Sequence, residues 1–188
     1  MNTYHGPIML TIRQKKISQK IGFLRRSAKP CLPNTTFKSL SSAMVLPLFD
    51  YCDVAWSSCT SGKLDKLVKL YNRLGRMILN AGPRTHITEL HEALSWQPLH
   101  DRWHYHRMCE VFKCVNNLNP NYLNSLFSVP SHSVGTRSST NGSLSVSVVP
   151  RTNAAKRTFQ YLGTLGWNKL TTAHRQASSL LRFKTFLK

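Results

Sequence analysis

The chain has 188 residues, enough for one domain or two small ones, and a hydrophobic content of 41% allows a packed core. Its 26 Lys and Arg residues against 7 Asp and Glu give a formal net charge of +19, which opposes compaction unless a polyanion neutralises it. No run approaches the ~18 apolar residues of a membrane-spanning helix, which excludes such a span. Nucleic acid is therefore the expected partner, and an anionic membrane surface is the alternative.

The acidic residues occupy only the middle of the chain. All seven lie between Asp50 and Glu110, so both flanks are purely cationic. A solvated basic surface would explain the charge alone, but the lack of interspersed acids favours a polyanionic partner.

The cysteines predict the redox setting. They are odd in number and irregularly spaced, at Cys31, Cys52, Cys59, Cys109 and Cys114. Together with the lack of a recognisable signal peptide, this pattern favours reduced thiols in a nuclear or cytoplasmic protein. The acid-free N-terminus, which contains Arg and Ser, leaves a mitochondrial transit peptide as an alternative.

The first expected element is a basic amphipathic helix over residues 12–28, after an unpatterned stretch at 1–11. Its apolar positions recur at helical spacing, and its cations fall mostly elsewhere around the helix. The cations expected to bind nucleic acid here are Lys15, Lys16, Lys20, Arg25 and Arg26. Pro30 and Pro33 should end the helix, and Asn34 or Thr35 should cap a second one that Pro47 interrupts.

Residues 62–80 form the clearest predicted helix. An apolar face is opposed by a second set of expected nucleic-acid-binding residues, namely Lys66, Lys69, Arg73 and Arg76. At 100° per residue these four fall within about 80° of one another, a cationic stripe ~15 Å long. Gly82 and Pro83 should end the helix.

The remainder is expected to be helical apart from one segment. Helices are predicted over 87–94 and 99–117, and helix returns over 165–188. Between them, residues 144–148 alternate with period two and could pair with a second strand near 158–161. The sequence thus predicts a mainly α fold. Its expected parts are a helical bundle over 12–128, a Ser/Gly-rich loop with a short strand over 129–157, and a strand-and-helix extension over 158–188.

Catalytic or metal-binding groups are not expected in this chain. Asp50 and Asp53 are three residues apart, but two carboxylates alone rarely hold a catalytic divalent ion, so a structural role is favoured. His104, His106, Cys109 and Cys114 would point in different directions from one helix, which disfavours zinc. No phosphate-binding glycine loop or nucleophile elbow is present, so no cofactor or small-molecule substrate is expected.

The pattern indicates binding, chiefly to a phosphate backbone. Lys and Arg neutralise phosphates, and aromatic side chains near them can stack on bases. The aromatic candidates are Tyr71, Trp103, Tyr105, Tyr161 and Trp167, although each taken singly is more typical of a core. The cationic stripes are the stronger signal, and they imply backbone contact without base specificity.

Several blocks, in order, resemble the region that follows the polymerase core in non-LTR (LINE-type, jockey-like) retrotransposon reverse transcriptases. The blocks are KISQKIGFLRR at 16–26, LPLFDYCDVAW at 46–56, LYNRLGRMI at 70–78, LSWQPLHDR at 94–102, TRS at 136–138, FQYLG at 159–163, WN at 167–168 and FK at 183–184. In this chain Thr171 and Thr172 stand where the family usually has a proline. The catalytic aspartates and the endonuclease lie upstream in the family and are absent here.

This resemblance implies a thumb-like helical region that holds RNA or DNA template and primer, with the polymerase core as a possible partner. The expected function is a nucleic-acid-binding fragment of an RNA-directed DNA polymerase that is not itself an enzyme. Two alternatives remain: a structural remnant of a mobile element without function, and a basic helical protein directed to membranes or mitochondria.

Overall fold

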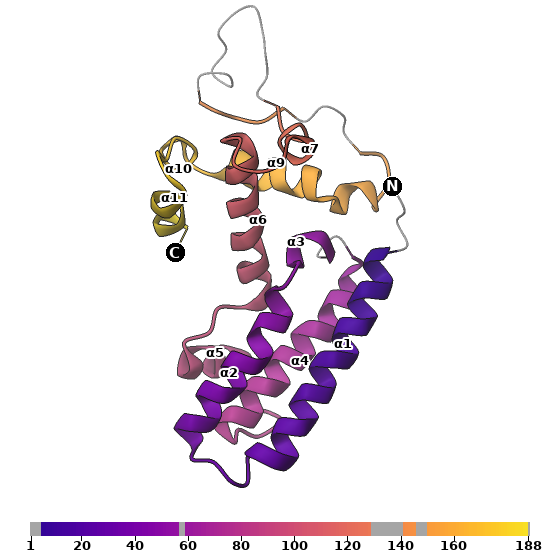
Figure 1. Cartoon of the computed structure of the whole chain (residues 1–188), viewed down its shortest axis with the longest axis vertical. Coiled ribbons are helices and arrows are strands. Elements are labelled where there is room, and N and C mark those ends of the chain that lie inside the picture. Colours follow the sequence, from indigo (N-terminus) through magenta and orange to yellow (C-terminus); the bar gives the residue numbers. More distant parts are fainter. Residues whose placement is uncertain (1–4, 57–58, 129–140, 146–149, 188) are drawn as a thin grey trace, which may run out of the picture. The chain divides into compact units, whose positions relative to one another are not determined.

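The computed structural model describes residues 5–56, 59–128, 141–145 and 150–187, and it is mainly helical, as the sequence predicts (Figure 1). The chain divides into two compact units, Met1–Arg102 and Trp103–Lys188. This division falls inside a helix, whereas composition placed a boundary near residue 128. Segments after residue 128 supply apolar residues to the core of the second unit, among them Leu144, Trp167 and Phe183.

The first unit is built on a bundle of three long helices. Its elements are α1 His5–Phe23, the π-helical turn η1 Leu24–Ala28, α2 Asn34–Asp50, α3 Asp53–Trp56, α4 Ser61–Leu79, α5 Ile87–Leu94 and the start of α6 Leu99–Val115. Helices α1, α2 and α4 lie side by side and contact one another pairwise (Figure 1). No helix of the described residues is long and apolar enough to cross a membrane.

Helix α4 follows the predicted 62–80 segment and supplies much of the core of this unit. Leu67, Tyr71 and Leu74 are fully buried, at the spacing that keeps side chains on one helical face. The helix ends at Asn80 (φ 53°), before the predicted Gly82, because asparagine tolerates the left-handed conformation of a helix C-terminus.

Two predictions about α2 were wrong. Asn34 is the first helical residue and not a cap, and Pro33 precedes it without a side-chain hydrogen bond to the helix. Pro47 lies inside the helix, which continues to Asp50. The proline removes one backbone donor, but its own carbonyl accepts from the Tyr51 N–H at 3.0 Å. Burial of Phe49 keeps this last turn packed on the bundle.

The second unit is organised around three aromatic rings that contact one another. Its elements are the remainder of α6, α7 Asn121–Asn124, η2 Ala155–Arg157, α9 Phe159–Lys169, α10 Thr172–Arg175 and α11 Leu180–Phe186. The rings of Phe112 and Phe183 stack with centroids 4.6 Å apart, and Trp167 lies 5.7 Å from Phe183. These residues bring α6, α9 and α11 into one core.

The predicted strand at 158–161 is wrong, because these residues begin helix α9. Thr158 caps the helix, its Oγ1 accepting from the Tyr161 N–H at 3.3 Å. Residues 146–149 of the first predicted strand lie outside the described residues. Leu144 has a different partner: the Asn168 side chain accepts from its N–H at 2.8 Å and donates to its carbonyl at 3.0 Å. An amide side chain therefore takes the place of a neighbouring strand.

We predict that Gly163→Ala lowers the free energy of unfolding by about 1–3 kcal/mol, measured by denaturant titration. A Cβ at this position in α9 would lie 2.9 Å from Val111 Cγ2 and 3.1 Å from the Phe127 ring, both in a packed core. The matched control is Gly62→Ala in α4, where nothing lies within 4 Å. That variant should gain about 0.5–1 kcal/mol, and equal effects of the two substitutions would contradict the packing of α6 against α9.

Candidate nucleic-acid interface

Side-chain hydrogen bonds hold α1 against the rest of the bundle. The Gln14 amide donates to the Lys63 carbonyl at the start of α4 at 3.0 Å. The Arg13 guanidinium donates to the Leu48 carbonyl of α2 at 3.0 Å. Ile17 and Ile21 are buried farther along α1, between these two hydrogen bonds and the π-helical turn. The hydrogen bonds and the two buried side chains together fix the alignment of α1 along α4.

Helices α1 and α4 together form a cationic groove, hereafter the α1–α4 groove, which consists of two adjoining hollows. The open hollow has a volume of about 520 Å³ and is lined by Thr11, Gln14, Lys15 and Ser18 of α1 and by Lys66, Lys69, Leu70 and Arg73 of α4. The end pocket, about 460 Å³, is lined by Ile21, Arg25, Lys29, Arg73, Arg76, Met77, Asn80, Ala81 and Pro83. Arg73 lines both hollows, so they adjoin at this residue.

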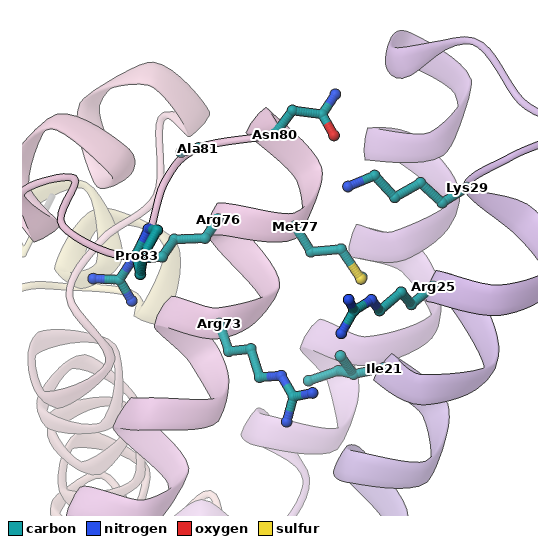
Figure 2. Close-up of a pocket in the computed structure, with 9 residues that line it drawn as sticks. All are labelled: Ile21, Arg25, Lys29, Arg73, Arg76, Met77, Asn80, Ala81 and Pro83. Carbon is teal, nitrogen blue, oxygen red and sulfur yellow. The ribbon is translucent and has the colours of Figure 1, made fainter.

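Figure 2 shows how the cations of the end pocket are directed. Arg25 and Lys29 extend from the α1–η1 side toward α4, Arg73 extends from α4 toward Ile21 and Arg25, and Lys29 lies nearer Asn80. Arg76 turns the other way, toward Pro83, where it donates to the Thr85 carbonyl at 3.3 Å. Three of the four cations therefore extend into the space between the two helices, and the fourth holds the turn after α4.

The structure divides the cations predicted from the sequence into two sets. Lys15, Arg25, Lys66, Lys69, Arg73 and Arg76 line the groove. Lys16, Lys20 and Arg26 are exposed and line neither hollow. Lys29 is not among the cations expected to bind nucleic acid, because the helix was expected to end at residue 28, before Pro30. Lys29 follows Arg25 by four residues, a helical spacing that could have predicted its place on the same side as Arg25. Its N–H donates to the Leu24 carbonyl at 2.9 Å and closes the π-helical turn.

The groove holds positive charge without local compensation. Neither hollow is lined by a carboxylate. Within the part of the chain that the structure describes, no acidic side chain forms an ion pair with a cation of the groove. Walls of one sign of charge raise the local concentration of anions, so the arrangement suits a polyanion.

Most of the aromatic candidates are not available for stacking on bases. Tyr71, Trp103 and Trp167 are buried, and Tyr105 and Tyr161 are half-buried. No aromatic residue lines either hollow of the groove. The chemistry that the groove offers is therefore contact with phosphates, with an apolar floor formed by Ile21, Leu70 and Met77.

Asp50 and Asp53 have structural partners. Arg102 makes a bidentate pair with Asp50, its Nε donating to Oδ1 at 2.6 Å and its second donor to Oδ2. Asp53 is buried at the start of α3, where its Oδ1 accepts from the Val54 N–H at 2.8 Å. Among the described residues, no group of three or more His, Cys, Asp or Glu side chains is placed to hold a metal ion.

Tyr71 connects α4 to the segment that leads into α6. Its phenol donates to the Gln97 carbonyl at 2.9 Å, and its ring lies 4.8 Å from that of Trp96. Burial is the main reason that the pKa of Tyr71 is raised to about 12, with Arg102 opposing the shift and Asp50 adding to it. The folded state therefore favours the neutral phenol.

This pKa predicts a loss of stability in alkali. An unfolded tyrosine ionises near pH ~10, so the contribution of Tyr71 is complete below that pH and is lost as pH rises to about 12. In this pH range, unfolding of the parent protein should release up to one more proton than unfolding of the Tyr71→Phe variant. The pH dependence of the free energy of unfolding of each protein measures this difference. The variant loses about 0.5–1.5 kcal/mol at neutral pH. Parallel pH curves for the two proteins would refute the burial of this phenol.

Comparisons with known proteins identify no relative: no family model, no curated protein and no solved structure matches this chain. The sequence resemblance and the geometry of the groove are thus the two grounds for a functional hypothesis.

Proposed function

We propose that the chain is a nucleic-acid-binding module that holds a strand by its phosphate backbone in the α1–α4 groove. The observation that carries this proposal is the pair of hollows that adjoin at Arg73, with cations on both walls and no carboxylate in the lining. A net charge of +19 adds a long-range attraction for polyanions.

The dimensions of the groove suit a short stretch of one strand. Lys66 and Arg73 are seven residues apart on α4, about 10 Å at 1.5 Å per residue. A strand in a duplex advances ~3.4 Å per nucleotide, so the stripe spans about three phosphates. The absence of aromatic residues from the described lining favours binding without base preference.

The resemblance to the region after the polymerase core of LINE-type reverse transcriptases indicates the setting in which such a module would act. In that setting the module would hold an RNA or DNA template and primer beside a polymerase core, without a catalytic centre of its own. Two of the resembling blocks, residues 16–26 and 70–78, lie on the two helices that form the groove.

A structural remnant would expose the apolar residues that once packed on missing elements. Trp56 and Trp103 are instead buried. Trp96 is half-buried and lies against Tyr71. Tyr51 is 63% exposed, but the Arg13 guanidinium covers its ring at 4.9 Å. These contacts favour a chain that folds on its own residues.

We predict that the triple variant Lys66→Gln, Lys69→Gln, Arg73→Gln binds nucleic acid more weakly and with a flatter salt dependence. Fluorescence anisotropy of a labelled RNA–DNA hybrid, titrated at several salt concentrations, measures both. The slope of log affinity against log salt should fall by about one unit per lost phosphate contact, about three in all. The loss should be similar for hybrids of different sequence.

The matched control is Lys16→Gln, Lys20→Gln, Arg26→Gln, which removes the same charge from exposed positions outside the groove. Removal of three positive charges weakens the long-range attraction equally in both variants. A difference in affinity or salt slope between the two variants therefore shows direct contact between the groove cations and the nucleic acid. Equal slopes for the two variants would move the interface elsewhere. Failure of the parent chain to bind at low salt, or preferential binding to anionic vesicles, would overturn the proposed function.

A further inference from the structure

We propose that the end pocket is a site for a terminal phosphate monoester of a nucleic-acid strand, distinct from the phosphodiester contacts of the open hollow. This inference rests on the proposed function, because it concerns how the α1–α4 groove receives the end of a strand. It assigns the residues Arg25, Lys29 and Arg73 to one phosphate group.

The first ground is the shape of the end pocket. Helix α4 and the α1–η1 segment form two walls, and the turn Asn80, Ala81 and Pro83 adds a third. The open hollow is lined by helix residues of α1 and α4 alone. A strand that follows the groove from Lys66 toward Asn80 therefore meets a wall at the end pocket, where a chain end fits better than a continuing backbone.

The second ground is the placement of the positive charges. Arg25, Lys29 and Arg73 extend into the space between the walls from two different helices (Figure 2). Arginine can engage two oxygens of one phosphate, and lysine adds a third donor as a point charge. A terminal phosphate offers three free oxygens, one more than an internal phosphodiester.

The third ground is the amount of charge. The C-termini of η1 and α4 lie at this pocket, and each carries roughly half a negative charge from its unpaired carbonyls. Four cations line the pocket, Arg76 among them, and they leave a net charge of about +3. A phosphate monoester carries about −1.5 to −2 near neutral pH, so it neutralises more of this charge than a singly charged phosphodiester.

The experiment compares three labelled oligonucleotides of one sequence: without a terminal phosphate, with a 5′-phosphate, and with a 3′-phosphate. Anisotropy titrations at fixed ionic strength give the affinity of the full chain for each. We expect one phosphorylated end to bind about tenfold more tightly than the unphosphorylated strand, which corresponds to ~1.4 kcal/mol. The favoured end then identifies the polarity of the strand in the groove.

Variants locate this preference. Arg25→Gln, Lys29→Gln should abolish the tenfold difference, so that all three oligonucleotides bind with equal affinity, and a cooperative thermal melt like that of the parent chain shows that the variant is folded. Lys66→Gln, Lys69→Gln should weaken all three oligonucleotides alike and leave the difference intact. The control Lys16→Gln, Lys20→Gln removes equal charge outside the groove and should also leave the difference intact.

The outcomes separate this inference from the proposed function. Equal affinity of the parent chain for all three oligonucleotides overturns the inference and leaves backbone binding standing. A preference that survives Arg25→Gln, Lys29→Gln overturns it as well, because the phosphate then binds elsewhere. Binding of none of the oligonucleotides overturns the proposed function and the inference with it.

Discussion

The packing of helix α4 into the bundle is the constraint on which the candidate interface depends. Burial of Leu67, Tyr71 and Leu74 orients the helix, and each fully buried side chain of this size contributes about 1.5–3 kcal/mol. The same rotation places Lys66, Lys69 and Arg73 beside α1, which is also basic. Repulsion between exposed like charges ~4 Å apart in water is only about 1 kcal/mol, so the apolar face decides the arrangement.

A groove formed in this way is coupled to its ligand. The fold holds cations of two helices close together without a carboxylate between them in the lining, so part of the packing energy offsets their repulsion. A bound polyanion removes that repulsion, and binding to the folded state alone then stabilises the fold by mass action. As salt is lowered, repulsion in the free chain and affinity for a polyanion both increase, so the stabilisation that the bound polyanion gives to the first unit should increase as well.

In the second unit, residues of helix α9 bind and cover the irregular segment that contains Gly142 and Leu144. Leu144 is buried, and its backbone groups require partners away from water. The Asn168 side chain supplies both hydrogen bonds, and the Trp167 indole donates to the Gly142 carbonyl at 2.9 Å. Adjacent residues of α9 thus bind this segment, while the stacked rings of Phe112 and Phe183 supply the apolar core.

The sequence by itself determined the helical class, the span of α4 and the cationic stripe on its outer face, because helical periodicity and charge are local properties. Tertiary structure decided which cations meet. Lys15, Arg25 and Lys29 reach the groove while Lys16 and Lys20 do not, since that depends on how α1 is rotated against α4. The strand expected near residue 158 is absent because these residues begin helix α9, and the Asn168 side chain pairs with Leu144 instead. Such contacts between segments distant in sequence leave no periodic signal along the chain.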